Sequence, residues 1–454
     1  MATRAVDRRA RPRMRPVRPA RVVVYGFAAA ILIGTGVLML PLSSRTGAWT
    51  NPVDALFTAT SAICVTGLTT LDTATHWSGF GQAAILVMIQ LGGLGIMIFA
   101  TLLGLILARR FTVRRRITAI AESSTLDRSD VRGAIRRVAL TSLVIEAIVF
   151  ALLLPRFALA YDHDVWLATW HALFHSVSAF NNAGFALYSD NLIGFAADPW
   201  ICLPLCAAII LGGLGFPVLH ELRRQFSWPR RWSMNTRLVL VVSAALLVVG
   251  TIYITAGEWS NPATLGAYSP GERVLIGFFH SVQTRTAGFN SVDIGLMAEH
   301  TRIGMDVLMF IGGGPGGTAG GIKVTTFAVL AFVLLAELRG ERVVNIFRKQ
   351  LAPEVMRQAL TVALIAVAAV VTGTIALMVI ADLGLDAALF ESVSAFATVG
   401  LTTGITPGLG APAKLVLVLL MFLGRLGPLT LGTAIALRER KELFEYPKER
   451  PAVG

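Results

Sequence analysis

Four short segments of the chain share a pattern that ends in a glycine. They read Ser-Ala-Ile-Cys-Val-Thr-Gly at 61–67, Ser-Ala-Phe-Asn-Asn-Ala-Gly at 178–184, Gln-Thr-Arg-Thr-Ala-Gly at 283–288 and Ser-Ala-Phe-Ala-Thr-Val-Gly at 394–400. Each follows a phenylalanine and lies between two long apolar stretches. We call them the filter segments, because four such segments around one axis could form a ring of backbone carbonyls. Such a ring can replace the hydration shell of a cation, so the pattern predicts an ion-conducting pore.

Three residues of each filter segment are the candidates for the ion site. The fourth segment contains Thr-Val-Gly, the first three letters of the potassium-channel filter sequence. Glycine is needed where the backbone adopts conformations that are closed to other residues. We expect the carbonyl groups of these residues to line one axial site for K+: Val65, Thr66, Gly67, Asn182, Ala183, Gly184, Thr286, Ala287, Gly288, Thr398, Val399 and Gly400.

A second candidate is the glycine-rich loop, which we define as residues 312–321. It has seven glycines, one proline and two other small residues: Gly312, Gly313, Gly314, Pro315, Gly316, Gly317, Thr318, Ala319, Gly320 and Gly321. No straight helix tolerates this run. It favours a broken helix whose loop crosses the conduction path as a gate; the alternative is a simple kink, for which one proline or glycine pair would suffice. A phosphate-binding loop is excluded, because Ile322 separates the last glycine from Lys323.

Four ionisable residues fall inside apolar stretches, where such residues are functional candidates. Arg425 is expected to face the glycine-rich loop from below the filter segments, to bond loop carbonyls and to oppose cation passage; the alternative is a pair with a neighbouring helix. Lys323 either caps the loop or extends to the cytoplasmic face. Glu146 and Asp306 are expected to form structural pairs.

Several other polar residues have simpler interpretations. Arg285, inside the third filter segment, is expected to point away from the axis and tie the segment to its scaffold. His175 and His280 occupy matching places in the second and third repeats, where the others have Thr58 and Glu391. We expect packing or hydrogen bonding there, since metal binding would need further ligands at fixed spacing.

Glycine clusters also follow every filter segment, at 91–95, 211–215, 311–315 and 423–427. Small residues permit close helix approach, which is the simpler interpretation for the first two clusters. Their common spacing from the filter segments suggests that they also surround the pore beneath it.

The composition indicates a membrane protein. Hydrophobic residues make up 55% of the 454 residues and charged residues 15%. Stretches of about 20 apolar residues can cross a bilayer. We expect spans at 21–41, 81–108, 138–160, 198–220, 237–256, 303–337, 358–382 and 413–437.

The net charge of +13 is distributed by side of the membrane. Of the 40 Lys and Arg residues, 32 lie in the segments 1–21, 109–137, 221–237, 338–357 and 438–454. The alternating segments carry more Asp and Glu than Lys and Arg. This is the positive-inside pattern, so both termini are expected in the cytoplasm. It favours contact with membrane lipids and argues against nucleic acid as the partner of the basic N-terminus.

The fold class that follows is an all-α polytopic membrane protein. Four pseudo-symmetric helix–pore loop–helix repeats are expected around one central pore, with pore helices at 52–63, 168–179, 272–283 and 386–397. The expected divisions are a basic tail 1–20, repeats 21–110, 135–224, 236–340 and 356–440, linkers 111–134, 225–235 and 341–355, and a tail 441–454. Residues 442–448 of that tail contain two aromatic residues and are expected at an assembly interface.

Two other classes of function are less consistent with these patterns. A secondary transporter of a small solute would show inverted repeats, whereas the charge pattern gives all four repeats the same orientation. An enzyme would need a constellation of nucleophile, base or metal ligands at membrane depth, and the sequence offers none. We therefore expect no catalytic residues and no organic cofactor.

At these residues the chain resembles the Trk/Ktr/HKT superfamily of potassium-uptake proteins, and specifically its Ktr-type membrane subunits. The motifs that carry the resemblance are Thr-Arg-Thr-Ala-Gly-Phe-Asn at 284–290, the glycine-rich loop with its continuation to 326, and Phe-Leu-Gly-Arg-Leu-Gly-Pro-Leu-Thr at 422–430. The resemblance implies one pore in each chain of a homodimer in the bacterial inner membrane. It also implies a cytoplasmic ring of nucleotide-binding regulatory subunits that controls the loop. Gly67 matches the potassium-selective pattern of the superfamily; sodium or mixed monovalent cation transport is the alternative.

Overall fold

The computed structural model describes residues 19–115 and 128–436, and these residues are almost entirely helical. The basic tail up to residue 18 and the segment 442–448 lie outside the described residues. Regular β-structure within the described ranges is limited to a small antiparallel hairpin of β1 (Asn345–Ile346) and β2 (Lys349–Gln350). The all-helical class predicted from the sequence is confirmed.

The helices follow one another in four groups along the chain. The first three groups contain α1 (Pro19–Met39), α2 (Pro52–Cys64) and α3 (Gly79–Arg115); α4 (Arg128–Ala160), α5 (Val165–Phe180), α6 (Pro199–Leu214) and α7 (Phe216–Gln225); and α8 (Met234–Glu258), α9 (Pro270–Gln283), α10 (Glu299–Phe310) and α11 (Val324–Leu338). The last contains α12 (Pro353–Ala381), α13 (Leu385–Ala397) and α14 (Ala411–Ala436). Single 3-10 turns lie at Pro41–Ser43, Ile193–Phe195, Pro229–Arg231, Leu265–Ala267, Ile294–Leu296 and Thr406–Gly408.

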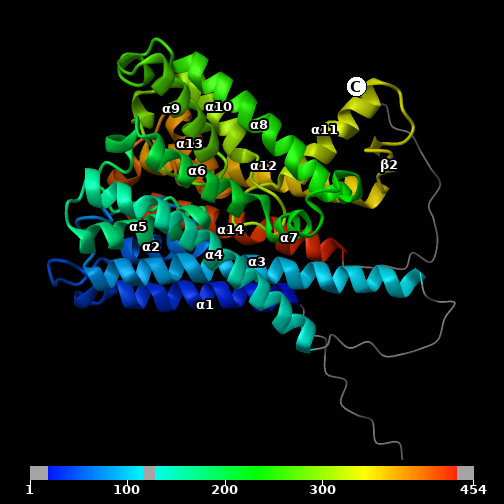
Figure 1. The fold of residues 1–454 in the computed structure, drawn as a ribbon, viewed down its shortest axis with the longest axis horizontal. Coiled ribbons are helices and arrows are strands. Elements are labelled where there is room, and N and C mark those ends of the chain that lie inside the picture. Colours follow the sequence, from blue (N-terminus) through cyan, green and yellow to red (C-terminus); the bar gives the residue numbers. More distant parts are fainter. Residues whose placement is uncertain (1–18, 116–127, 437–454) are drawn as a thin grey trace, which may run out of the picture.

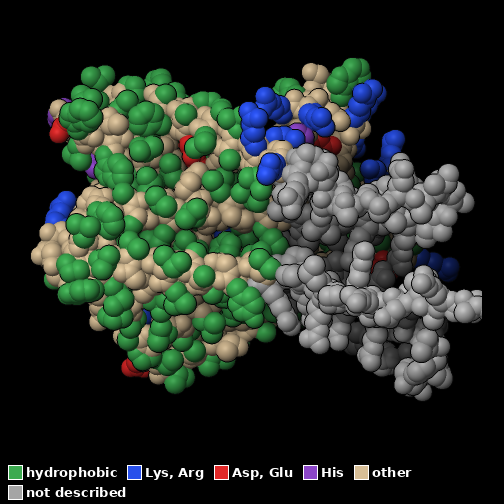
Figure 2. Space-filling model, turned by 90° about the horizontal axis from the view of Figure 1, so that it is seen from below, with side chains coloured by type: hydrophobic (Ala, Val, Ile, Leu, Met, Phe, Trp, Pro, Cys, Tyr) green, Lys and Arg blue, Asp and Glu red, His purple; other side chains and the backbone are tan. Residues whose placement is uncertain are grey.

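The long helices give the molecule the character of a multi-pass membrane protein. In the described ranges, five helices are each long and apolar enough to cross a bilayer: α1, α3, α4, α8 and α12. Helices α1 and α3 run side by side along the long axis in Figure 1, α4 crosses obliquely against α3, and the β1–β2 hairpin lies at the opposite end from α2, α5 and α9. Figure 2 shows hydrophobic side chains covering the helical body, with Lys and Arg gathered toward the hairpin end.

The short helices α2, α5, α9 and α13 are not membrane spans. At 1.5 Å per residue their 13 to 16 residues reach about 20–24 Å, less than the bilayer's hydrocarbon thickness. Side-chain caps start three of them: Asn51 accepts from Val53 N, Asp164 from Trp166 N, and Ser269 forms a capping box with Glu272. The phenylalanines that precede the filter segments (Phe57, Phe174, Phe279 and Phe390) lie in these helices and are fully buried.

The expected span at 198–220 is divided into two helices by a sharp bend. The structure bends by 98° between α6 and α7, at Gly215, whose φ is +93°. The bend has a local cause, since glycine tolerates this backbone conformation and Pro217 favours the first turn of a new helix. The expected span 303–337 is divided into α10 and α11, with residues 311–323 outside helices. Helix α14 covers the expected span 413–437 up to Ala436.

At three of the glycine clusters, the helix that follows a filter segment packs closely against the last turn of the short helix before that segment. A Cβ on Gly92 of α3, Gly212 of α6 or Gly424 of α14 would clash with the carbonyl oxygen of Ile63, Phe180 or Phe396 respectively. Each of these carbonyls belongs to the last turn of the short helix that precedes a filter segment. The glycines therefore set how closely the surrounding helices approach the filter segments.

We predict that Gly92→Ala destabilises the protein whereas Gly95→Ala, in the same cluster, does not. The added methyl group at position 92 forces α3 away from α2, which costs about 1–3 kcal/mol. At position 95 the nearest atom would lie 3.8 Å away, in ordinary contact. Thermal melting of the two variants in detergent is the measurement. Equal melting temperatures would show that close approach at Gly92 is unimportant.

Candidate functional site

The four filter segments have the same backbone conformation. Each begins within three residues of the C-terminal end of α2, α5, α9 or α13. The residue two before each filter glycine has positive φ: Val65 (56°), Asn182 (57°), Thr286 (68°) and Thr398 (51°). The glycines themselves also have positive φ: Gly67 (96°), Gly184 (70°), Gly288 (80°) and Gly400 (97°).

This conformation is costly, and its repetition is informative. β-Branched residues rarely adopt positive φ, so Val65, Thr286 and Thr398 are outliers that the surrounding structure must hold in place. The residue between the two positive-φ positions of each segment is Thr66, Ala183, Ala287 or Val399. These four residues do not have positive φ. Alternation of φ in sign turns successive carbonyl groups toward the same side of the backbone. Strain of this kind is typical of sites where the backbone itself binds a ligand.

The filter glycines contact one another in a closed cycle. A Cβ on Gly67 would lie 2.5 Å from the carbonyl oxygen of Ala183, and a Cβ on Gly184 would lie 2.7 Å from that of Ala287. A Cβ on Gly288 would clash with the carbonyl oxygen of Val399, and one on Gly400 with that of Thr66, which returns to the first segment. The structure thus brings the four filter glycines and the residue before each of them together in one ring of contacts.

Side chains at the start of each segment hold this backbone. Ser61 Oγ accepts a hydrogen bond from Gly67 N at 3.1 Å, and Ser394 Oγ accepts one from Gly400 N at 3.1 Å. Ser178 Oγ donates to Phe185 O at 2.8 Å. The third segment is one residue shorter, and there Gln283 Oε1 accepts from Phe289 N at 3.1 Å. These four residues were not among the predicted site residues, although their recurrence at the first position of the pattern was the signal that could have found them.

The glycine-rich loop lies against the bases of two filter segments. Thr318 Oγ1 donates to Asn182 Oδ1 at 2.9 Å, and a Cβ on Gly320 would clash with the hydroxyl of Thr398. The loop is held by main-chain bonds to the break between α6 and α7: Gly314 N donates to Gly213 O at 2.8 Å, and Phe216 N donates to Gly316 O at 3.1 Å. The glycine-rich loop and the break between α6 and α7 thus provide hydrogen-bond partners for each other's main-chain groups. Such partners are required inside a bilayer, where no water is available.

Three cationic side chains donate to carbonyls of the loop. Arg425 Nη1 donates to Thr318 O, and Lys323 Nζ donates to Ala319 O. Arg285 Nη2 donates to Gly312 O at 3.3 Å. Arg425 is 4% exposed, and its Nε and Nη2 have no partner among the described residues.

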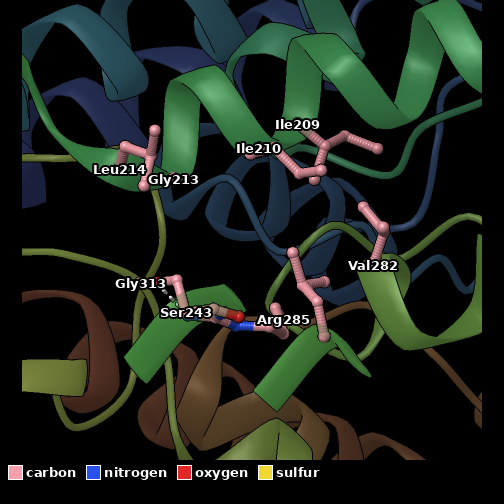
Figure 3. A pocket seen from close by; sticks show the side chains of 9 residues that line it. Ile209, Ile210, Gly213, Leu214, Ser243, Val282, Arg285 and Gly313 are labelled. Carbon is pink, nitrogen blue, oxygen red and sulfur yellow. Dashed lines mark hydrogen bonds between the residues drawn. The ribbon is translucent and has the colours of Figure 1, made fainter. Parts of the chain in front are cut away.

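Arg285 has a larger role than the sequence suggested. It also donates to Ser243 of α8, from Nη1 to the carbonyl oxygen at 3.0 Å and from Nη2 to Oγ at 3.2 Å. Figure 3 shows Arg285 beside Ser243 and near Gly313, at a cavity of about 30 Å³. This one guanidinium therefore connects the third filter segment, α8 and the start of the glycine-rich loop. The sequence could not show the connection to the loop, because 27 residues separate the two.

Two of the filter glycines border a cavity of about 280 Å³. Gly67 and Gly184 line it together with Asp72 and Tyr188. Burial alone would raise the pKa of Asp72, but hydrogen bonds from Ser189 Oγ, Thr75 Oγ1 and Ala74 N hold that pKa below its ordinary value. A charged carboxylate therefore lines this cavity at neutral pH, where it attracts cations.

Glu146 and Asp306, the two remaining buried ionisable candidates, differ in their surroundings. Glu146 accepts from Ser142 Oγ at 2.8 Å, from Gln90 Nε2 at 3.1 Å and from Asn181 Nδ2 at 3.2 Å, directly behind the second filter segment. Neither carboxylate oxygen of Asp306 has a hydrogen-bond partner in the described ranges. The expected structural pairing is therefore observed as a hydrogen-bonded cluster for Glu146 alone.

Comparisons with known proteins agree with this geometry. The family model described as TrkH, cation transport protein, matches residues 18–446. The Ktr system potassium uptake protein B of Bacillus subtilis (strain 168) is 38% identical over 94% of this chain and 95% of its own. The potassium/sodium uptake protein NtpJ of Enterococcus hirae is 35% identical over 99% of both.

A solved structure is also similar. The crystal structure of the potassium transporter TrkH from Vibrio parahaemolyticus aligns with a TM-score of 0.72 and 17% identity, covering 94% of this chain and 87% of that one. At that identity the likeness shows the fold. With the family match across nearly the whole sequence and two relatives above 30% identity, the chain belongs to the TrkH family of cation transport proteins, which are transporters rather than enzymes.

Proposed function

We propose that the chain is the potassium-uptake membrane subunit of a Ktr-type system. The observation that carries this proposal is the closed cycle of filter glycines, in which four segments with one backbone conformation contact one another in sequence. Carbonyl groups turned to one side of each segment can ligate a cation that has lost its water. The short helices α2, α5, α9 and α13 direct the negative ends of their dipoles toward the same place.

In this proposal the four groups of helices are four repeats around one central pore. Both termini lie in the cytoplasm of a bacterial inner membrane, and the cavity beside Asp72 is the external entrance. The similar Ktr system potassium uptake protein B of Bacillus subtilis supports potassium as the transported ion. The relative named as a potassium/sodium uptake protein supports sodium as a second ion for a closely related site.

We further propose that the glycine-rich loop is the gate. The loop lies against the bases of two filter segments, and Arg285, Lys323 and Arg425 engage three of its carbonyls. Those carbonyls are then occupied by donors and cannot ligate a passing ion. The positive charges oppose cation entry as well, so this arrangement represents a closed pore.

Opening then requires a stimulus from outside the membrane. We propose that a homodimer of this chain docks on a cytoplasmic ring of nucleotide-binding regulatory subunits, which moves the loop. The exposed basic residues Arg339, Arg342, Arg348 and Lys349, around the β1–β2 hairpin, offer a surface near the loop's C-terminal helix α11. Their charge suits either an acidic protein surface or anionic lipid headgroups.

The selectivity prediction concerns Gly67→Ser. A side chain at Gly67 would meet the carbonyl of Ala183 and would have to adopt a φ of +96°, which costs about 1–3 kcal/mol. One quarter of the ring is then displaced, so discrimination between potassium and sodium should fall. Uptake of each ion by a potassium-uptake-deficient bacterium is the measurement. Gly36→Ser, at a position in α1 with open space around it, is the control; an unchanged ratio in the Gly67 variant would count against this filter.

The gating prediction concerns Arg425→Ala. Loss of the bond to Thr318 and of one buried charge should raise potassium flux into proteoliposomes without the regulatory partner by about tenfold or more. A shortened linker over 314–318 should have the same effect. Lys414→Ala is the matched control, because Lys414 lies on the same helix but pairs with Asp54 at 2.7 Å, away from the loop. If the folded Arg425 variant conducts no faster than the unaltered protein, the loop is not the gate.

A further inference from the structure

One buried position recurs in all four short helices and is occupied by residues of different chemistry. Thr58, His175, His280 and Glu391 each directly follow the buried phenylalanine that precedes a filter segment. All four are at most 1% exposed. Residues so different in chemistry at equivalent buried positions must each be accommodated by a different set of partners.

In three of the four repeats this residue is bonded to the same place. His175 Nε2 lies 3.4 Å from Leu187 N, and His280 Nε2 lies 3.2 Å from Ser291 Oγ. Glu391 Oε1 accepts from Thr403 N at 3.0 Å. Leu187, Ser291 and Thr403 are each the third residue after a filter glycine. The bond therefore fixes the chain three residues beyond the filter glycine, farther along than the bonds made by Ser61 and its equivalents.

The fourth repeat has the strongest form of this attachment. Glu391 also accepts from Thr402 Oγ1 at 2.6 Å, from Thr403 Oγ1 at 3.3 Å and from Thr406 Oγ1 at 2.7 Å. A carboxylate has enough acceptor sites for all these donors, whereas an imidazole has one. The residue after Thr406, Pro407, lines the entrance cavity, so the attachment spans from the filter to the mouth.

The first repeat lacks the attachment. The equivalent residues are Thr58 and Thr70, and neither hydroxyl has a hydrogen-bond partner among the described residues. The threonine side chain is too short to reach across the gap that histidine and glutamate bridge. The four quarters of the ring are therefore held with different strength, weakest in the first repeat and strongest in the fourth.

We propose that Glu391 is a positioning residue for ion selectivity, which holds the exit of the fourth filter segment by its bonds to Thr402, Thr403 and Thr406. The inference rests on the proposed filter. Discrimination between cations of different radius requires that the ring does not contract around the smaller ion. Fixing the residues directly beyond Gly400 restricts such contraction in one quarter, and it does so through hydrogen bonds rather than through contact with the ion.

The test compares Glu391→Ala with Glu391→Gln in the full-length chain, expressed in a potassium-uptake-deficient bacterium. The measured quantity is the ratio of the KM values for sodium and potassium uptake. Alanine removes every bond, so the ratio should fall by about five- to tenfold. Glutamine keeps an acceptor for Thr402 and Thr403, so its ratio should stay within about twofold of the original. An unchanged ratio in the alanine variant, or an equal loss in both, would overturn the proposal.

A second variant covers failure of the alanine protein to fold. Thr402→Val combined with Thr406→Val removes two donors from the other side of the same bonds and should lower the ratio similarly. Glu258→Ala is the matched control. Glu258 is also fully buried and accepts from Asn261 Nδ2, Thr264 Oγ1 and Ala298 N, but none of these donors lies within the six residues after a filter glycine. The Glu258→Ala variant should lower stability and leave the KM ratio unchanged. A similar fall of the ratio in this variant would show that the loss of any buried carboxylate has the effect, and it would overturn the positioning role of Glu391.

The same assay separates this inference from the filter itself. If Gly67→Ser changes the ratio and the Glu391 and threonine variants do not, the proposed role of the Glu391 hydrogen bonds in selectivity is wrong, whereas the proposed filter is supported. If none of them changes the ratio, both proposals fail.

Discussion

The structure depends on the close approach of four backbone segments that leave no room for a side chain at their meeting point. Each filter glycine faces the carbonyl of the next segment in the cycle, and β-branched neighbours are held at positive φ. This arrangement is unfavourable locally, so it must be maintained by its surroundings. The fully buried phenylalanines of the short helices, the serine and glutamine bonds, and the glycines that admit α3, α6 and α14 all serve that one requirement.

A second constraint, the satisfaction of main-chain groups at membrane depth, explains the other irregular features. The glycine-rich loop and the break between α6 and α7 exchange hydrogen bonds, so neither could exist alone in an apolar environment. Arg285, Lys323 and Arg425 complete the set of partners for the loop. A few polar contacts therefore hold a segment that has almost no apolar side chains of its own.

The sequence was sufficient to predict the short helices and the interruption at 312–321, because repetition and glycine content report directly on backbone conformation. The assignment of the filter residues stays a prediction. The sequence predicted a span at 198–220 without the break inside it, since a single glycine before Phe216 and Pro217 does not by itself break an apolar stretch; the loop that stabilises the break lies about a hundred residues away in sequence. The contacts of Arg285 with the loop and of Glu391 with three threonines were likewise hidden, because they join residues through the fold. Equivalence of His175 and His280 with Glu391 was visible, but not what these residues hold.

The central claim is that the four segments form one cation site on a single axis. Anomalous diffraction from crystals of the full-length protein soaked in thallium or rubidium ions tests it most directly, since both ions substitute for potassium and are located independently of protein density. The account predicts an anomalous peak enclosed by the carbonyl oxygens of all four segments, at the level of Gly67, Gly184, Gly288 and Gly400. The account would be contradicted if crystals soaked at saturating ion concentration gave no peak there, or if the ions were bound only elsewhere in the molecule.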